Sequence, residues 1–193
     1  MDVKTIAVIG ANAIGRGVAC VAAGCGFSIV LEDVSDTRLQ QASAWIAERL
    51  ASSTSGRAAL GCVSTAHTVE GAIRDADLII ETLPDEMEMQ IELFTILDKF
   101  AKPNAIFAST GSISITELAE VTFCADRCIG MRFTARIAEM KAIQLVRGAE
   151  TSDETVAACR EVAHRMGKEV TVINDAGADE SGDPKRKFAN AQN

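Results

Sequence analysis

The sequence is short of positive charge. Its 193 residues include 19 Lys and Arg against 27 Asp and Glu, which gives a formal net charge of −8. A protein that binds the phosphate backbone of DNA or RNA needs a basic surface. We therefore expect no nucleic-acid partner. A small phosphate-bearing ligand is not excluded, because backbone N–H groups at a helix N-terminus hold phosphates locally.

Cysteine and histidine pairs at metal-ligand spacing are absent. No C-x-x-C occurs, and neither His67 nor His164 stands at ligand spacing from a cysteine pair. A chain of this length builds its own core without disulfide bonds. We expect buried, reduced thiols and no metal site. The six cysteines are Cys20, Cys25, Cys62, Cys124, Cys128 and Cys159.

A long apolar run near the start of the chain raises the question of a membrane span. Residues 6–31 are long enough to cross a bilayer, but they contain five glycines, Asn12 and Arg16. So many glycines favour a strand–turn–helix–turn–strand over one spanning helix. Asp2 offsets Lys4 and no clear cleavage site follows, which disfavours a signal peptide. We expect a cytoplasmic protein without membrane contact.

Short apolar runs alternate with amphipathic stretches along the chain. This alternation predicts an α/β fold with a mostly parallel, doubly wound sheet and helices on both faces. The expected strands span residues 3–9, 27–31, 62–65, 78–83, 105–109, 128–133, 143–146 and 170–173. The expected helices span residues 14–23, 37–51 and 87–100, and a last one from 151 to 167.

Polar residues suggest where these helices begin and where the domain ends. Asp36 is placed to cap the second helix. Thr151 and Glu154 have the spacing of a capping box for the last helix, and Gly167 closes it. Residues 1–175 thus form one domain, and residues 176–193 form a polar, aperiodic tail.

A glycine-containing turn joins the first expected strand to the first helix. It reads Gly10-Ala11-Asn12-Ala13-Ile14-Gly15. This is the place of the G-x-G-x-x-G dinucleotide fingerprint, in which Gly10 permits a tight turn and Gly15 lets the helix pack against the strand. Asn12 replaces the second glycine, where the backbone approaches the pyrophosphate. A weakened site is therefore as consistent with this loop as an intact one.

An acidic residue follows the second expected strand. Asp33 lies 23 residues after Gly10, where an acid accepts hydrogen bonds from the ribose hydroxyls of NAD and repels the 2′-phosphate of NADP. Strand, loop, helix, strand and acid in this order predict a Rossmann-type domain that binds NAD in preference to NADP. The alternative is a glycine turn that only packs a helix on the sheet.

Several segments resemble the 3-hydroxyacyl-CoA dehydrogenase family, over nearly the whole length up to about Asp175. Residues 77–86, DLIIETLPDE, are similar to the family's D-L-V-I-E-A-V-P-E, which places Glu81 at the acid near the nicotinamide ribose. Residues 106–119, IFASTGSISITELA, resemble I-F-A-S-N-T-S-S-L-S-I-T-E-L-A with one residue fewer. The resemblance implies NAD-dependent oxidation of a 3-hydroxyacyl-CoA in fatty acid metabolism.

The family's proton-transfer dyad is changed in this chain. Family members use a histidine in G-M-H-F-F-N-P and a glutamate in M-K-L-V-E-V. Here residues 130–136 read GMRFTAR and residues 140–145 read MKAIQL, so Arg132 and Gln144 take the two places. A guanidinium has no lone pair to accept a proton, and glutamine is neutral. The resemblance therefore implies a degenerate active site, with Ser112, Arg132 and Gln144 in the catalytic-cleft positions.

Three further departures point the same way. Gln90 stands where the family has a lysine that faces the cofactor, and Ala135 replaces the asparagine after the histidine. After Asp175 the family continues P-G-F-I-V-N-R into a helical domain that covers the acyl chain and builds the dimer. Residues 176–179 read AGAD instead, and the sequence stops soon after. We expect a stand-alone domain whose open cleft a homo-oligomer or a partner protein could cover.

The sequence leaves three functions open. The first, which we favour, is an NAD(H)-binding domain without the family's proton transfer. The second is an active NAD-dependent oxidoreductase of altered mechanism, acting on a 3-hydroxyacyl or related hydroxy-acid substrate. Arg132 would then hold a carboxylate or phosphate, or polarise a carbonyl, with Ser112 or Gln144 placing the oxygen. The third is an interaction module that completes another protein's cleft. A dinucleotide is the expected ligand, with an acyl-CoA or an acidic small molecule; the alternative for Arg132 is a solvent-facing side chain.

Overall fold

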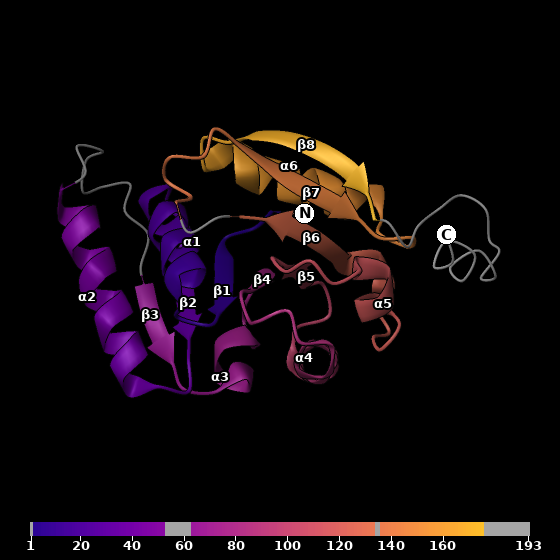
Figure 1. Cartoon of the computed structure of the whole chain (residues 1–193), viewed down its shortest axis with the longest axis horizontal. Helices are drawn as coiled ribbons and strands as arrows, with labels where there is room; N and C mark the ends of the chain where they lie inside the picture. Colours follow the sequence, from indigo (N-terminus) through magenta and orange to yellow (C-terminus); the bar gives the residue numbers. More distant parts are fainter. Residues whose placement is uncertain (1, 53–62, 134–135, 176–193) are drawn as a thin grey trace, which may run out of the picture.

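The computed structural model describes residues 2–52, 63–133 and 136–175, and these contain one sheet in the order β3-β2-β1-β4-β5-β6-β7-β8 (Figure 1). The strands are β1 (Thr5–Ile9), β2 (Ser28–Glu32), β3 (Val63–Ala66), β4 (Leu78–Glu81), β5 (Ile106–Ser109), β6 (Cys128–Arg132), β7 (Ala142–Arg147) and β8 (Glu169–Asn174). The helices are α1 (Ala13–Gly24), α2 (Asp36–Ser52), α3 (Val69–Ile73), α4 (Met87–Phe100), α5 (Ile115–Ala119) and α6 (Asp153–Arg165), and residues 125–127 form a 3-10 turn.

The sheet is mostly parallel, as predicted. The neighbouring strands from β3 through β2, β1, β4 and β5 to β6 all pair in parallel. Strand β7 runs antiparallel to β6, and β8 is parallel to β7. Parallel neighbours need a crossover of a dozen or more residues, usually a helix. Only residues 133–141 separate β6 from β7, which suits the antiparallel pairing. The antiparallel pair lies where the family's catalytic residues are expected.

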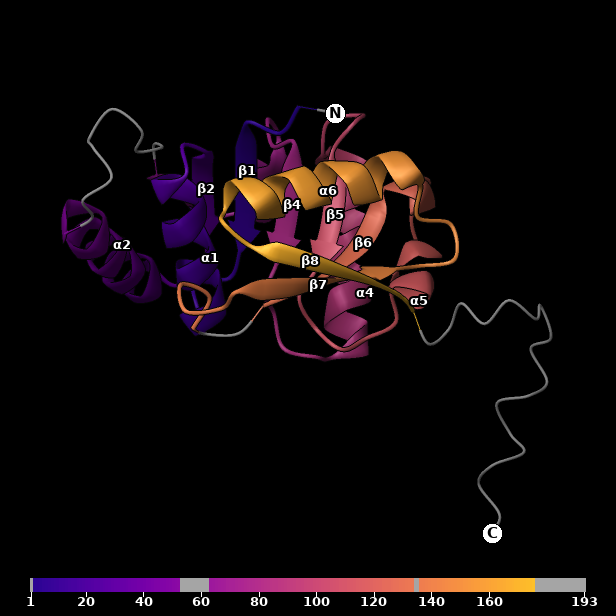
Figure 2. The same cartoon turned by 90° about the horizontal axis from the view of Figure 1, so that it is seen from above.

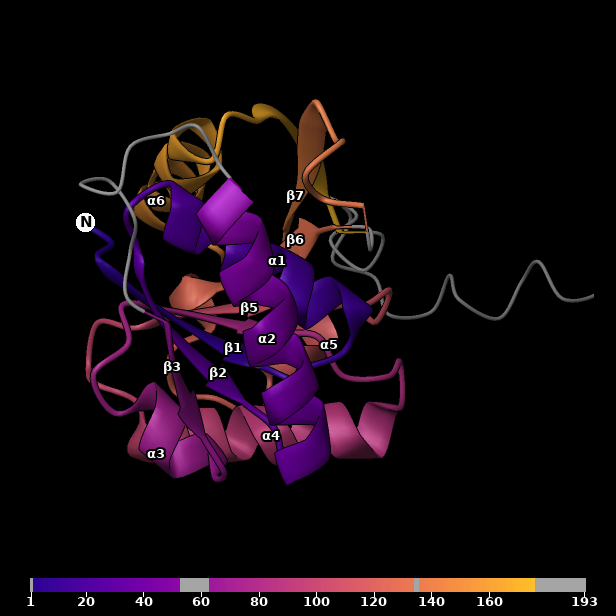
Figure 3. The same ribbon diagram turned by 90° about the vertical axis from the view of Figure 1, so that its left-hand side faces the viewer.

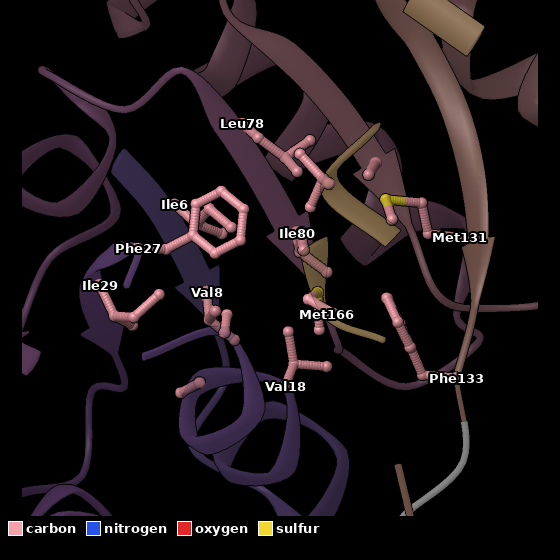
Figure 4. Packing of buried hydrophobic residues seen from close by; sticks show 14 of the residues in the cluster. Ile6, Val8, Val18, Phe27, Ile29, Leu78, Ile80, Met131, Phe133 and Met166 are labelled. Atoms are coloured by element: carbon pink, nitrogen blue, oxygen red, sulfur yellow. The ribbon is translucent and has the colours of Figure 1, made fainter. Parts of the chain in front are cut away.

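Helices cover both faces of the sheet. Helices α1, α2 and α6 pack on one face, and α3, α4 and α5 pack on the other (Figure 3). Figure 2 shows α6 beside β8 at one end of the sheet. Alternate strand residues enter the two cores, because successive side chains of a strand point to opposite faces. In Figure 4, Val18 of α1, Ile80 of β4 and Met166 after α6 lie together in the core that α1, α2 and α6 cover.

The predicted cap of α2 is wrong by one residue. Asp36 lies inside the first turn of the helix. Ser35 precedes it, and its Oγ accepts a hydrogen bond from Arg38 N at 3.4 Å. Serine and aspartate both carry an oxygen suited to capping. Their order alone therefore does not decide which residue caps.

The predicted capping box of α6 is also wrong. Ser152 caps the helix, because its Oγ accepts a hydrogen bond from Thr155 N at 3.2 Å. Thr151 instead donates through Oγ1 to the carbonyl of Cys128 at 2.6 Å and so ties the helix entry to β6. Gly167 follows the helix with φ +71°, as its predicted role at the helix end requires.

The apolar run at residues 6–31 forms β1, α1 and most of β2, as the sequence predicted. Among the described residues, no helix combines the length and apolar character needed to span a membrane. Helices α3 and α5 and the 3-10 turn were not expected, because each has only three to five residues and too little length for a helical period. Predictions for Cys62, Ala135 and the tail at 176–193 lie outside the described residues.

Candidate functional site

The glycines at either end of the turn after β1 permit a close contact between loop and helix. Gly10 has φ +98°, in the left-handed region that favours glycine, and its N–H donates to Glu32 O at 2.9 Å. A Cβ on Gly15 would lie 1.9 Å from Gly10 O, so no other residue fits there without movement. Helix α1 thus begins directly against the loop backbone, with its N-terminus at the carboxyl edge of the sheet.

Asn12 caps α1 in an ordinary extended conformation, with φ −74° and ψ −173°. Its Oδ1 accepts hydrogen bonds from Ile14 N at 2.9 Å and from Gly15 N at 3.0 Å. Its Nδ2 donates to the carbonyl of Thr82, which follows β4. The side chain therefore occupies two of the N–H groups that a helix N-terminus offers to a phosphate.

Thr82 joins the loop to the neighbouring strand. Its Oγ1 donates toward the carbonyls of Ile9, at 2.9 Å, and Gly10, at 3.1 Å. A Cβ on Gly10 would lie 2.8 Å from the same oxygen. Thr82 stands where the similar family segment has alanine, and this difference could have indicated the contact from the sequence.

Asp33 lies after β2, is 6% exposed and has several partners within the chain. Its Oδ2 accepts a hydrogen bond from Ala11 N at 3.0 Å. Its Oδ1 accepts from Ser35 N at 2.9 Å and from Arg38 Nε at 3.0 Å, and Arg38 Nη2 lies 2.9 Å from it. Arg38 was not predicted as a partner from the sequence, although a basic residue in the first turn of α2 is within reach of an acid at the end of β2.

A second acid lies immediately before Asp33. Glu32 is 3% exposed at the end of β2. Burial, together with the carboxylates of Asp33 and Glu70, raises the pKa of Glu32 to about 7. The end of β2 therefore contains one acid, Glu32, that ionises near neutral pH.

Glu81 ends β4 and is fully buried. Ser109 Oγ donates to its Oε1, and Leu83 N donates to its Oε2 at 2.8 Å. Burial raises the pKa of Glu81, although both hydrogen bonds favour the carboxylate. The acid expected near the nicotinamide ribose is thus fixed from β5 and from its own loop.

The shortened loop after β5 closes onto Asp85. Ser112 N donates to Asp85 Oδ1 at 2.8 Å, and Ser112 Oγ donates to Asp85 Oδ2 at 2.7 Å. A Cβ on Gly111 would lie 2.0 Å from Asp85 Oδ1. Ser112 is therefore held by Asp85 rather than directed at Arg132 and Gln144.

Gln90 is fully buried in α4 at the place of the family's lysine. Its Nε2 donates to Pro84 O at 3.2 Å and lies 3.5 Å from Asp85 Oδ1. Its Oε1 is buried without a hydrogen-bond partner among the described residues. An unpaired buried acceptor is uncommon, because it costs about 1–3 kcal/mol.

Arg132 and Gln144 lie opposite each other in the antiparallel pair of β6 and β7. The Arg132 side chain is half-buried, and its Nη1 has no hydrogen-bond partner among the described residues. Burial lowers the pKa of Arg132, while the carboxylates of Asp85, Asp175 and Glu81 oppose this effect. An arginine titrates so far above neutrality that the guanidinium stays charged. The side chain is thus neither fully exposed nor fully buried.

A pocket of about 330 Å³ opens beside these two residues. Its lining comes from β6, β7, β8 and the residues that precede β7. Among the described residues that line it, only Arg132 is charged. The other lining residues are Phe133, Met140, Ala142, Ile143, Gln144 and Thr171. Ser112 is not among them.

Lys168 supports the segment that precedes β7. It is 7% exposed, and its Nζ donates to the carbonyls of Ile137 and Met140 at 2.7 Å each. Burial lowers the pKa of this ammonium. The two carbonyl contacts hold Met140 at the pocket wall from the entry of β8.

Metal and disulfide chemistry find no support in the described residues. No group of three or more His, Cys, Asp and Glu side chains is arranged to hold a metal ion there. Cys20, Cys25, Cys124, Cys128 and Cys159 are free thiols, and Cys62 lies outside the described residues.

Residues 5–176 match the protein family described as 3-hydroxyacyl-CoA dehydrogenase, NAD binding domain. The chain belongs to this family. A 3-hydroxybutyryl-CoA dehydrogenase of Bradyrhizobium diazoefficiens is 38% identical to it over 182 residues, which are 90% of this chain and 62% of the relative. A probable 3-hydroxybutyryl-CoA dehydrogenase of Bacillus subtilis is 34% identical over 184 residues, 91% of this chain and 64% of the relative. The chain thus spans a little under two thirds of these relatives.

Solved structures agree with this membership. The 3-hydroxybutyryl-CoA dehydrogenase of Escherichia coli superposes with a TM-score of 0.84 at 28% identity, over 90% of this chain and 39% of that one. The (S)-3-hydroxybutyryl-CoA dehydrogenase of Ralstonia eutropha gives a TM-score of 0.82 at 29% identity, over 91% of this chain and 65% of that one. The fold is therefore that of the family's Rossmann-type domain, for which a nicotinamide dinucleotide is the cofactor.

Proposed function

We propose that this domain binds NAD(H) at the carboxyl ends of β1, β2 and β4 and does not itself perform the family's histidine-dependent proton transfer. The observation that carries the proposal is the pairing of Arg132 with Gln144 in adjacent strands, at the places of the family's histidine and glutamate. Cofactor binding and proton transfer depend on different residues, so separate experiments test them.

The loop after β1 fits a dinucleotide. Gly10 and Gly15 leave no room for a Cβ, so the backbone lies bare where a pyrophosphate approaches a helix N-terminus. In the bound state, Asn12 Oδ1 must share or release the N–H groups of Ile14 and Gly15. Ala11 and Ala13 flank it with small side chains. NAD supplies hydride acceptance in this family; the residues named here supply binding only.

Asp33 favours NAD over NADP, because a carboxylate beside the adenosine ribose accepts from its hydroxyls and repels a 2′-phosphate. Arg38 works against this preference, since its guanidinium lies against Asp33 Oδ1 and can receive a phosphate. We propose that Asp33 dominates because it is buried, whereas the side chain of Arg38 is 56% exposed. Glu81 would accept from the second ribose.

No histidine of the chain replaces the missing base. His67 follows β3, where its Nδ1 lies 3.2 Å from Asp36 Oδ1, and His164 lies in the last turn of α6. General-base catalysis needs a group within hydrogen-bond reach of the proton that it removes. Neither residue lines the pocket beside Arg132. The proposal therefore leaves cofactor binding in place and removes proton transfer.

Titration of NADH into the protein tests binding. Quenching of Trp45, the single tryptophan, and enhancement of NADH fluorescence report the complex. Asp33→Ala should weaken NADH binding at least about tenfold, because it removes a carboxylate that accepts hydrogen bonds from the ligand. His164→Gln, on α6, serves as the control and should not change it. Absence of binding at millimolar NADH would contradict the proposal.

Restoration of the dyad tests the chemistry. The wild type should not oxidise 3-hydroxybutyryl-CoA with NAD, whereas Arg132→His combined with Gln144→Glu should give measurable NADH formation. General acid–base groups contribute about 10²–10⁴-fold in rate, so even a poorly placed dyad should rise above the wild type. Each single variant should remain inactive. Turnover by the wild type at the rate of the double variant would refute the loss of proton transfer.

A further inference from the structure

We propose that the pocket between β6, β7 and β8 is a binding site for a small organic monocarboxylate, held by Arg132 with Gln144 and Thr171 as additional polar contacts. This assignment deepens the proposed function, because it names the ligand class of the cleft beside the cofactor site. A free acid lacks the CoA thioester that the family's name implies. The assignment rests on the pocket lining, on the unpaired guanidinium nitrogen and on the pairing of the surrounding acids.

The guanidinium has a donor to spare. Arg132 Nη1 is buried and makes no hydrogen bond within the described residues. A buried donor without a partner costs about 1–3 kcal/mol, more when it is charged. Arg132 also lines the pocket, and a carboxylate suits the fork of a guanidinium, which donates two parallel hydrogen bonds; a ligand in the pocket reaches Nη1 once the side chain turns toward it. Water or a neutral carbonyl would satisfy the donor less well.

The carboxylates near Arg132 are engaged with other donors. Glu81 accepts from Ser109 and Leu83. Asp85 accepts from the backbone and hydroxyl of Ser112. These contacts fix both acids at β4 and at the loop after β5, so neither is held by the Arg132 fork as its hydrogen-bond partner.

Asp175, which follows β8, is likewise held by hydrogen bonds within the chain. Its Oδ2 accepts from Ser114 Oγ at 2.7 Å and from Thr116 N at 2.9 Å. Together with Glu81 and Asp85, it makes the surroundings of Arg132 acidic at longer range. One positive charge near three acids tolerates a monoanion better than a phosphate dianion, because like charges repel. A carboxylate therefore fits this site better than a phosphate.

The walls of the pocket are apolar, and its volume is small. Phe133, Met140, Ala142 and Ile143 form the walls. A volume of about 330 Å³ lies near the lower end of the range of about 300–1,000 Å³ that is usual for small-ligand pockets. The ligand should therefore be a short acid, with its alkyl end on these walls and its carboxylate at Arg132. Gln144, which replaces a glutamate, removes a charge that would repel it.

Calorimetric titration with sodium butyrate, without cofactor, tests the site. Butyrate should bind with a Kd of about 1–10 mM, and butyramide at the same concentrations should not. Arg132→Met, which keeps the length and apolar stem of the side chain, should weaken butyrate at least about tenfold. Arg136→Gln is the matched control: its side chain is 80% exposed and pairs with Glu139, and butyrate affinity should be unchanged.

Gln144→Glu gives a second variant in case Arg132→Met fails to fold. It places an internal carboxylate opposite the arginine and should also abolish butyrate binding, while thermal unfolding checks that the fold persists. Absence of butyrate binding to the wild type would overturn the proposal, and so would equal affinity for butyramide or an unchanged affinity in either variant. Because the butyrate titration contains no NAD, a failure of butyrate binding is distinct from a failure of NADH binding.

Discussion

Two parts of the carboxyl edge of the sheet differ in the hydrogen bonds that their polar side chains make within the chain. Around β1, β2 and β4, Asn12 caps α1 and the Asp33 carboxylate accepts hydrogen bonds from Ala11, Ser35 and Arg38. At the end of β6, Arg132 Nη1 is buried with no hydrogen-bond partner in the described residues. The sequence departs from the family's motifs in both parts, at Asn12 in the first and at Arg132 and Gln144 in the second.

The two parts differ in how far the chain itself provides hydrogen-bond partners. Asp33 and the loop after β1 make hydrogen bonds within the chain, and a ligand bound there would have to replace some of them. Arg132, which lines the pocket beside β6, instead has a buried Nη1 with no partner among the described residues. Buried polar atoms are nearly always paired in proteins, and Arg132 Nη1 is one of three such side-chain atoms in the described residues without a partner, with Arg16 Nε and Gln90 Oε1. Three variants break or sharpen this contrast.

The largest effect is expected from Gly15→Ala, which breaks the cofactor part. Its Cβ would lie 1.9 Å from Gly10 O, so α1 must move away from the loop. We expect the free energy of unfolding to fall by about 3 kcal/mol or more, measured by urea denaturation. Gly24→Ala is the control in the same helix, because its Cβ would meet only Leu50 Cδ2 at 3.6 Å. Equal effects of the two variants would contradict the close packing of α1.

An intermediate effect is expected from Glu32→Gln. The pKa of Glu32 lies near 7 in the folded protein against an ordinary value of 4.5. Between these values the folded state binds more protons than the unfolded state, so stability due to this group is present at pH 4.5 and is lost as pH rises through 7. The variant should gain about 1–3 kcal/mol over the wild type across this window.

Denaturant unfolding of Glu32→Gln and wild type at pH 4.5, 6 and 8 measures this difference. Glu161→Gln, at an exposed position of α6, is the control and should show no such trend. A constant difference between Glu32→Gln and the wild type at all three pH values would show that Glu32 does not titrate in this window.

The smallest effect is expected from Asn12→Gly, which sharpens the comparison by opening the phosphate loop. Without the side chain, Ile14 N and Gly15 N become available to a phosphate, and NADH affinity should rise about 3–10-fold. Stability should change by only a few tenths of a kcal/mol, since glycine is a tolerated N-cap. Asn12→Asp keeps the cap, adds a negative charge and should weaken NADH. Unchanged affinity in both variants would mean that the cap does not compete with the cofactor.

The sequence predicted elements best where one pattern sufficed. Helix α4 has the predicted bounds, because its apolar residues recur at helical spacing before Pro103. The caps of α2 and α6 were each misplaced by one residue, because adjacent Ser, Thr and Asp side chains can all cap. The contacts of Asp33 and Ser112 could be predicted only in part. Arg38 and Asp85 reach them through turns, and the geometry of a turn does not follow from the periodicity of the apolar residues.

By itself, the sequence determined the alternation of strands and helices, the phosphate loop, the family and the replacement of its dyad, because these depend on residue types in a fixed local order. The tertiary structure decided what surrounds the replacements. It pairs Arg132 with Gln144 across two antiparallel strands, brings Thr171 from β8 to the same pocket, and leaves Arg132 Nη1 without a partner among the described residues. Such contacts join residues far apart in the chain, and only the packed sheet fixes which donors remain unsatisfied.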